Sequence, residues 1–260
     1  MRTARFAGVG LATALVLAGC SNGGTTPTAD ATSAGAPASA GASASVGAAD
    51  PAAVEALTKA TSQLGTTSFK ITATSGTGFK LAGAIDPAKG VGTAELKASG
   101  TNADLNLKTL LIEKDLYLQV PGFTKAGTWT HVDVARLPEG ANVGLRPGEI
   151  DPVNTSNLLG SATDVHATGG NSYAGTLDLT KAAGLAGVSQ VTVDNTQAQN
   201  VPFTAGLDEQ GRLSVLTIQI PNAQPLEVLY TDYGVPVTAA RPAASEITEA
   251  PDSLYQSLGS

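Results

Sequence analysis

The chain is poor in the residue types that carry most protein chemistry. Its 260 residues include one cysteine, two histidines and one tryptophan, and aromatic residues make up 4%. A single cysteine excludes a disulfide within the chain, so a folded domain must be stabilised by its hydrophobic core. The sequence has no G-x-S-x-G, phosphate-binding-loop or H-E-x-x-H motif and no set of cysteine ligands. We therefore expect no catalytic residues, no metal site and no cofactor.

Basic residues are fewer than acidic ones, with 15 Lys and Arg against 22 Asp and Glu and a net charge of −7. This balance argues against a nucleic-acid partner, because nucleic-acid binding rests on cationic contacts to phosphates. It also argues against attachment to anionic lipid through a basic patch.

Long apolar runs are absent except at the start of the chain. Residues 6–17 are mostly apolar, follow Arg2 and Arg5, and are too short for the ~20 residues that a spanning helix needs. The run ends in Leu17-Ala18-Gly19-Cys20, with small residues where a signal peptidase cuts. We therefore predict that residues 1–19 are a signal peptide.

Leu17-Ala18-Gly19-Cys20 resembles the lipobox of bacterial lipoproteins. The resemblance implies that the Cys20 thiol receives a diacylglyceryl group and that the signal is cut just before it. The mature chain would be anchored to the cell membrane on its extracytoplasmic face, and two or more acyl chains would hold it firmly. Without the two signal arginines, 13 basic and 22 acidic residues remain, a net charge of about −9. The alternatives are an ordinary secretory signal with a free cysteine, or a short membrane anchor.

Residues 20–50 are predicted to form the lipidated cysteine and a disordered tether. Of the 30 residues in 21–50, 26 are Ala, Ser, Gly, Thr or Pro, which cannot bury a core. A coil of this length has an r.m.s. span of ~30 Å, so the folded domain could rest on the membrane or stand away from it.

The folded domain is predicted to span 51–242 and to begin with a helix. Asp50 suits the N-cap, Pro51 suits the first turn, and Gly65 would end a helix over Pro51–Leu64. Val54, Leu57 and Leu64 fall near helical spacing, with Ala60 between them.

After this helix the apolar residues alternate with polar ones, which predicts an antiparallel meander with one dry face. Its strands lie around residues 69–73, 79–85, 94–98, 105–108 and 116–120. A connection rich in Pro and Gly over 137–152 leads to a short helix over 155–159. A second meander follows, with strands over 172–179, 201–207, 213–220 and 226–232, and a further short helix over 180–188. Residues 243–260 are predicted to be a loose C-terminal extension.

These elements predict an α+β fold with about ten strands in a single antiparallel sheet. A sheet of this size curls, and its concave dry face must then be filled. Helices could fill that face completely, or cover it in part and leave a ligand cavity.

Few residues could carry other chemistry. His131 and Asp133, and likewise Asp164 and His166, share one side of a strand because residues i and i+2 do so. Neither pair has a third ligand or a nucleophile nearby, so solvated polar residues are favoured over a metal or acid–base site. For Trp129, packing on the sheet is favoured over contact with a ligand.

The order of segments resembles the LppX/LprA/LprF/LprG lipoproteins of mycobacteria and related actinobacteria. The similarity covers roughly residues 50–242. It is carried by the lipobox, the tether and, in order, Ala56-Leu57-Thr58-Lys59-Ala60-Thr61, Thr67-Ser68-Phe69-Lys70-Ile71, Asp115-Leu116-Tyr117-Leu118, Gly127-Thr128-Trp129, Asp151-Pro152, Leu158-Leu159, Tyr173-Ala174-Gly175-Thr176-Leu177-Asp178-Leu179, Val201-Pro202-Phe203-Thr204-Ala205-Gly206-Leu207-Asp208-Glu209-Gln210-Gly211, Tyr230-Thr231-Asp232-Tyr233-Gly234 and Val235-Pro236-Val237.

The resemblance implies a strongly curved half-barrel sheet with helices covering its concave face, similar to the Lol lipoprotein carriers. It also implies a protein without catalytic residues that binds acylated lipids or glycolipids in a hydrophobic cavity. Such a protein helps to move them across the cell envelope, in some cases with a membrane lipid transporter. The loop over 137–152 is longer than in the relatives and would alter the cavity entrance.

We predict nine cavity-lining residues on the dry face. A surface scaffold that docks a partner protein, with its concave face filled by its own side chains, is the alternative. An enzyme is a more distant one and would depend on His131 and Asp133. The nine residues are Phe69, Ile71, Leu81, Leu96, Leu105, Leu107, Leu118, Leu177 and Phe203.

Overall fold

A computed structural model describes residues 49–99, 104–119, 121, 124–125, 127–137, 145, 150–180 and 198–258. The chain divides into two units, Met1–Ser43 and Ala44–Ser260, and the described residues belong to the second. The predicted signal peptide and Cys20 lie outside the described residues. So do residues 21–48 of the tether, residues 181–188 of the predicted helix over 180–188, and most of the connection over 137–152. Within the described ranges, no helix is long and apolar enough to cross a membrane.

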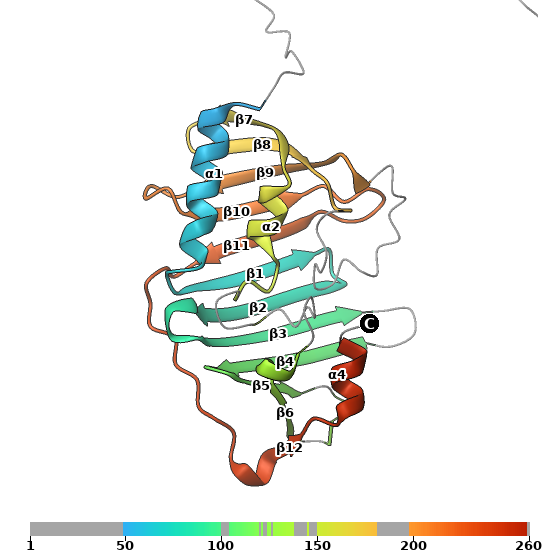
Figure 1. Cartoon of the computed structure of the whole chain (residues 1–260). Helices are drawn as coiled ribbons and strands as arrows, with labels where there is room; N and C mark the ends of the chain where they lie inside the picture. Colours follow the sequence, from blue (N-terminus) through green and yellow to red (C-terminus); the bar gives the residue numbers. More distant parts are fainter. Residues whose placement is uncertain are drawn as a thin grey trace, which may run out of the picture. The chain divides into compact units, whose positions relative to one another are not determined.

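The described domain is built on one sheet of twelve strands (Figure 1). The sheet is open, because β12 and β7 form its two edges. Every neighbouring pair is antiparallel except β12 and β6, which run parallel, so the sheet is mixed and not purely antiparallel as predicted. In spatial order the strands are β12 (Ile247–Glu249), β6 (Trp129–Asp133), β5 (Asp115–Gln119), β4 (Asp104–Ile112), β3 (Val91–Ser99), β2 (Phe79–Asp86), β1 (Phe69–Ser75), β11 (Leu226–Thr231), β10 (Leu213–Ile218), β9 (Val201–Leu207), β8 (Ser172–Leu177) and β7 (Thr163–Gly169).

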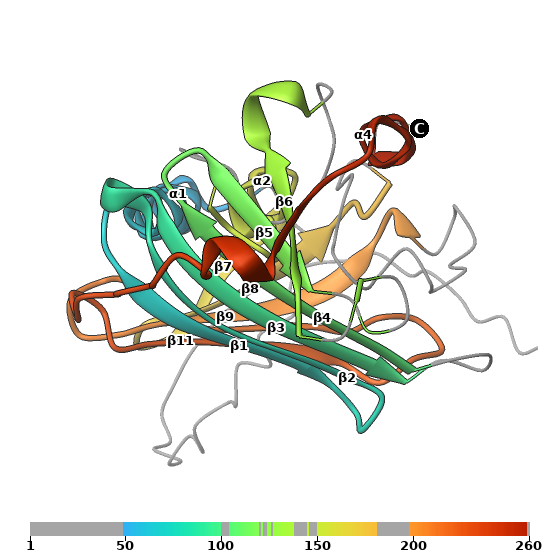
Figure 2. The ribbon, with the colours of Figure 1, turned by 90° about the horizontal axis from the view of Figure 1, so that it is seen from below.

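The two predicted meanders are present and share this sheet. Strands β1 to β6 form the first and β7 to β11 the second, each from neighbours in sequence. The first strand of one pairs with the last strand of the other, with Ile71 opposite Tyr230. Figure 2 shows β6 steeply inclined to β1 and β2, which is the accumulated twist expected of a long sheet.

Helix α1 (Pro51–Leu64) has the predicted bounds. The Asp50 side chain accepts a hydrogen bond from the Ala52 N–H at 2.9 Å, and Pro51 occupies the first turn. The buried side is lined by small and branched residues, including Leu57, which is 4% exposed. Val54 is 40% exposed and lies outside this buried side, although it falls near helical spacing with Leu57.

Helices α1 and α2 (Thr155–Gly160) lie against the same face of the sheet, over β7 to β11 in Figure 1. We call this the inner face; it carries Phe69, Ile71 and Ala73, which belong to one hydrophobic core with the buried residues of both helices. The opposite side is the outer face. The core therefore lies between the sheet and the helices, and the sheet's alternation of apolar and polar residues decides which side chains enter it.

The expectation of a loose C-terminal extension is corrected by the structure. After a short 3₁₀ turn, η3 (Ala244–Glu246), the chain forms β12 beside β6 and then helix α4 (Asp252–Leu258). Ala250 and Tyr255 are 7% and 6% exposed and belong to the hydrophobic core. The C-terminal residues are thus a packed part of the domain, because a strand edge and an apolar surface are both available to them.

Candidate functional site

The inner face is apolar across most of the sheet. Strand register places Leu81 opposite Leu96, and Leu96 opposite Leu107, in one row of side chains. A parallel row runs from Phe79 through Ala98 to Leu105. All of these positions share one face, so the sheet presents a continuous apolar surface on this side.

The nine predicted lining residues all lie on elements of the sheet, but their surroundings differ. Six of them are at most 8% exposed and belong to the hydrophobic core: Phe69, Ile71, Leu81, Leu96, Leu177 and Phe203. Leu107 and Leu118 are half-buried against that core, whereas Leu105 is 41% exposed. The structure therefore brings three of the nine, Leu105, Leu107 and Leu118, to the border between core and solvent.

These border residues form what we call the apolar corner, at the end of the inner face where β3 ends and β4 begins. Its members are half-buried apart from Leu105, which is more exposed. A leucine side chain left in water is unfavourable relative to a covered one, at about 25 cal/mol for each Å² of apolar surface. The apolar corner is thus the described part of the inner face that could gain most from an apolar ligand. It consists of Phe79, Ala98, Leu105, Leu107 and Leu118.

A series of hydrogen bonds that the sequence did not predict fixes α2 on the inner face. The Thr155 hydroxyl bonds to the Tyr230 hydroxyl on β11, and it donates to Asp151 at 3.4 Å. Asp151 also accepts from the N–H groups of Val153 and Thr155, at 3.0 and 2.6 Å. Burial raises the pKa of Asp151 although these hydrogen bonds oppose the change, and burial raises that of Tyr230 further. These hydrogen bonds therefore hold α2 against the inner face of the sheet.

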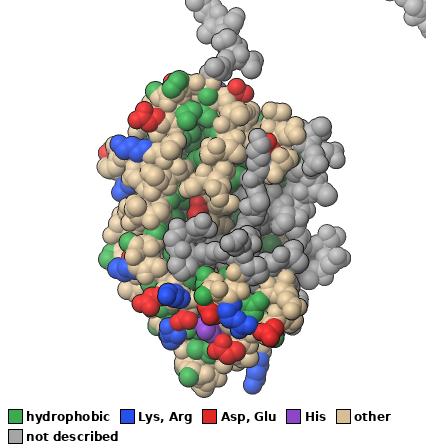
Figure 3. Space-filling model, in the orientation of Figure 1, with side chains coloured by type: hydrophobic (Ala, Val, Ile, Leu, Met, Phe, Trp, Pro, Cys, Tyr) green, Lys and Arg blue, Asp and Glu red, His purple; other side chains and the backbone are tan. Residues whose placement is uncertain are grey.

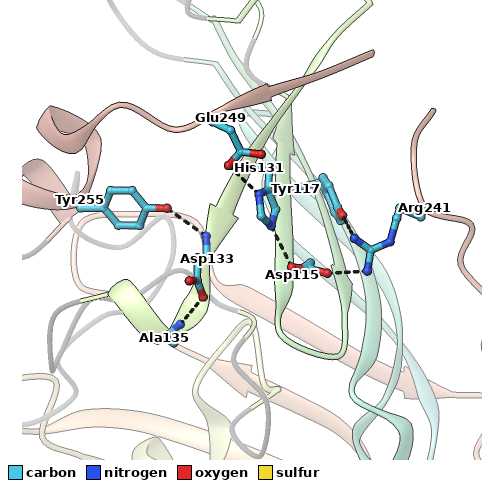
Figure 4. Close-up of polar contacts among 8 residues, drawn as sticks. All are labelled: Asp115, Tyr117, His131, Asp133, Ala135, Arg241, Glu249 and Tyr255. Atoms are coloured by element: carbon cyan, nitrogen blue, oxygen red, sulfur yellow. Dashed lines mark hydrogen bonds and ion pairs between the residues drawn. The ribbon is translucent and has the colours of Figure 1, made fainter. Parts of the chain in front are cut away.

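The outer face carries a cluster of charged residues around His131 (Figure 4). The His131 Nε2 lies 2.9 Å from Oδ1 of Asp115, and Nδ1 lies 2.8 Å from Oε2 of Glu249. Arg241 donates to Asp115 at 2.5 Å and to the Tyr117 hydroxyl at 2.6 Å. Figure 3 shows acidic and basic side chains gathered at the lower end of the molecule, where β5, β6 and β12 lie in Figure 1.

Contacts within the cluster change the pKa values of His131 and Asp115. Partial burial alone would lower the pKa of His131, but hydrogen bonds to Glu249 and Asp115 outweigh it and raise that pKa. The hydrogen bond to His131 lowers the pKa of Asp115, assisted by Arg241 and opposed by burial. Both changes favour an imidazolium between two carboxylates.

In neither of the two pairs that share a strand side do the acid and imidazole side chains contact each other; His131 is half-buried, not the solvated residue that the sequence favoured. Asp133 caps the short 3₁₀ turn η2 (Val134–Arg136) by accepting from the Ala135 N–H at 2.9 Å, while His131 turns to Asp115 and Glu249. His166 is exposed and lies 2.7 Å from the main-chain oxygen of Asp164.

The partners of His131 also bear on metal binding. Asp115 and Glu249 approach opposite nitrogens of the ring, so they do not converge on one point. Within the described ranges, no group of His, Cys, Asp and Glu could hold a metal ion.

A groove of about 630 Å³ lies on the outer face, within the range of small-ligand sites. Ala82, Ala84 and Thr93 form its floor, and Trp129 contributes to its wall. Residues 238–240 of the C-terminal segment also line it. Trp129 is therefore half-buried in an open groove on the outer face, away from the core of the sheet.

A second cavity, of about 640 Å³, is lined by residues 154–163 around α2. Asn154, Ser156 and Asn157 are among the residues that line it. Neither this cavity nor the outer groove has one of the nine predicted lining residues in its wall.

No protein-family model matches this chain, and no curated protein matches it either.

Proposed function

We propose that this chain is a membrane-tethered lipoprotein that binds acylated lipids or glycolipids and helps to move them across the cell envelope. The observation that carries the proposal is the apolar corner, where a continuous apolar face reaches solvent at Leu105. Acyl chains laid against it would gain about 0.8 kcal/mol for each buried CH₂ group. No catalytic step is needed for this role.

The finer form of the fold belongs to the same proposal. We infer that the sheet acts as a half-barrel whose concave side is the inner face, with α1 and α2 covering part of it. The strong twist of β6 against β1 and β2 supports this inference, and so do the two helices on one face (Figures 1 and 2). An acyl chain would enter beyond the helices, at the corner.

Attachment to the membrane is proposed to rest on Cys20. A diacylglyceryl group there would hold the chain on the extracytoplasmic face, and the tether of residues 21–50 would give a reach of ~30 Å. The acidic net charge fits attachment through acyl chains better than through a basic patch. Delivery of the lipid would involve a second membrane component, and we propose a membrane lipid transporter for this role.

The experiment compares two exposed leucines on opposite faces. Leu105 on the inner face and Leu229 on the outer face are 41% and 39% exposed, so Leu105→Glu and Leu229→Glu add the same charge at equal exposure. The full chain and both variants are produced in an actinobacterial host, purified in detergent and extracted with solvent for mass spectrometry. Lipid released by mild solvent from the folded chain is distinguished from the acyl groups that stay covalently bound at Cys20.

The expected result is stoichiometric non-covalent lipid on the wild type and the Leu229 variant, and at least a several-fold loss on Leu105→Glu. Binding of a fluorescent fatty-acyl probe should follow the same order. The absence of extractable lipid from the wild type, together with no probe binding, would overturn the proposal.

A second candidate is a surface scaffold that docks a partner protein. It is favoured by one observation, namely that six of the nine predicted lining residues are already covered by the protein's own side chains. A scaffold of this kind would carry no lipid, and both leucine variants would leave its lipid content at zero. The extraction experiment therefore separates the two functions.

A further inference from the structure

The C-terminal segment passes around one edge of the sheet, from the outer to the inner face. On the outer face, the Arg241 guanidinium lies 5.7 Å from the ring centre of Tyr117. At the edge, β12 pairs with β6, and beyond it Ala250 and Tyr255 enter the core of the inner face. In Figure 1 this segment runs from β11 to the lower edge and ends in α4. We call residues 236–249, which lie on the outer face and at this edge, the clasp; α4 is held separately, through Tyr255.

Two charged residues of the clasp meet the sheet at one small site. Arg241 bonds to Asp115, and Glu249 bonds to His131. Because Asp115 and His131 also bond to each other, at 2.9 Å, both attachments depend on the same pair. The main-chain N–H of Ala250 adds a bond of 2.9 Å to the His131 carbonyl.

The number of hydrogen bonds that the His131 ring donates to its two carboxylate partners depends on its protonation state. An imidazolium donates from both nitrogens and can serve both carboxylates at once, whereas a neutral ring donates from only one. After deprotonation, one carboxylate oxygen would face a ring lone pair, and the cluster would carry an excess negative charge. The charged and titratable groups around His131 are Asp115 and Tyr117 from β5, Glu249 from β12, Arg241 from the clasp and Asp133 on its own strand.

We propose that the clasp is a pH-dependent latch, docked on β6 when His131 is an imidazolium that bridges Asp115 and Glu249, and released when His131 loses its proton. Release would remove residues 238–240 from the outer groove and Ile247 from beside Trp129. The device is independent of lipid binding, because it lies on the outer face and at the edge of the sheet.

The direction of the pH dependence follows from the raised pKa of docked His131. Its contribution is fully present below the undocked pKa of about 6.5 and is lost as the pH rises through the higher docked value. For each pH unit between these two values, the ratio of released to docked clasp should rise about tenfold.

Trp129 provides the reporter, because it is the only tryptophan of the chain. Acrylamide quenching of its fluorescence measures how accessible it is, and hydrogen exchange measured by mass spectrometry follows the Ala250 amide. Both are recorded on the full chain in detergent between pH 5.5 and 9, with exchange corrected for its intrinsic pH dependence. Quenching and Ala250 exchange should rise together, with a midpoint above pH 6.5.

The variants use both histidines of the chain. His131→Gln should show the released values at every pH, and Glu249→Gln should move the midpoint down because it removes one acceptor of the imidazolium. His166→Gln, on the exposed strand β7, should behave as the wild type. Exchange of the β10 and β11 amides in each variant shows that the sheet is intact. Exchange at Ala250 that is constant across the pH range, or a midpoint unchanged in Glu249→Gln, would overturn the proposal.

Discussion

The main-chain N–H of Asp133 donates a hydrogen bond of 3.0 Å to the Tyr255 hydroxyl, which joins the end of β6 to α4. Tyr255 also lies under the Arg136 guanidinium, 4.1 Å from the ring centre, and Arg136 pairs with Asp252 at 2.6 Å. One buried aromatic residue thus holds the last helix through its hydroxyl, its ring face and its apolar area. These contacts attach the C-terminal helix to the end of β6 and to η2.

Tyr255→Phe should destabilise the domain by about 1 kcal/mol, because the ring stays in place while the half-buried N–H of Asp133 loses its partner. Tyr255→Ala should cost about 3 kcal/mol or more, because the ring contacts and the buried area are lost as well. Urea unfolding followed by circular dichroism measures both. Equal unfolding midpoints for the wild type and the Phe variant would show that the hydroxyl bond contributes nothing.

The hydroxyl contact between Thr155 and Tyr230 offers a second prediction. Thr155→Val preserves the shape of a fully buried side chain and removes its hydroxyl, so both Tyr230 and Asp151 lose a partner. We expect a loss of about 1–3 kcal/mol in the free energy of unfolding. Thr155→Ser, which keeps the hydroxyl, should lose less.

A double-mutant cycle with Tyr230→Phe tests whether this loss comes from the contact itself. The two single substitutions remove the same hydrogen bond, so their effects should be less than additive by at least about 0.5 kcal/mol. Additive effects would mean that Thr155 and Tyr230 act independently of each other.

Two glycines with open space around them allow the effect of backbone conformation on stability to be measured without side-chain clashes. Nothing lies within 4 Å of a Cβ added at Gly211 or at Gly160, but Gly211 has a φ of +73° and Gly160 lies in α2. Gly211→Ala should therefore destabilise by about 1–2 kcal/mol, because left-handed backbone is unfavourable for alanine. Gly160→Ala should be neutral or should stabilise by up to about 1 kcal/mol. The midpoint of thermal unfolding, measured for both variants, should fall for Gly211→Ala and should stay unchanged or rise for Gly160→Ala.

The elements that the sequence predicted well are those whose signals are local. Helix α1 is specified by Asp50 and Pro51 at its start and by Gly65 at its end, and its bounds are as predicted. Strand β9 is likewise specified by its own alternation of side chains, and its predicted bounds, 201–207, are those of the structure. Both kinds of signal act within a few residues, so no knowledge of the tertiary structure was needed.

The features that the sequence did not predict depend on contacts between distant segments. His131 bonds to Asp115, 16 residues away, and to Glu249, 118 residues away, whereas the sequence suggested its neighbour Asp133. Strand β12 has only three residues, too few for alternation to be recognised, and it forms because β6 offers a free edge.

The apolar corner shows the same limit. Alternation placed Leu105 on the inner face with Leu107, but the amount of covering chain decides how exposed each one is.

The hairpin between β9 and β10 gives a prediction for acid pH. Asp208 accepts from the N–H groups of Gln210 and Arg212, both at 2.9 Å, and pairs with the Arg212 side chain at 2.7 Å. Partial burial opposes ionisation, but these hydrogen bonds outweigh it and lower the pKa of Asp208. The contribution of Asp208 is therefore present above its ordinary pKa of about 3.9, and it is lost as the pH falls through the lower folded value.

Asp208→Asn should lower the free energy of unfolding by about 1–3 kcal/mol at pH 7, because an ion pair and charge-assisted hydrogen bonds are lost. The difference from the wild type should shrink below pH 4, where the wild type loses the same contribution. Glu209→Gln removes an equal charge from an exposed neighbour and should change stability by less than about 0.5 kcal/mol. Urea unfolding at pH 3, 5 and 7 measures all three proteins. A deficit of the Asn variant that stays constant down to pH 3 would contradict the lowered pKa, because it would mean that Asp208 binds protons equally in the folded and the unfolded chain.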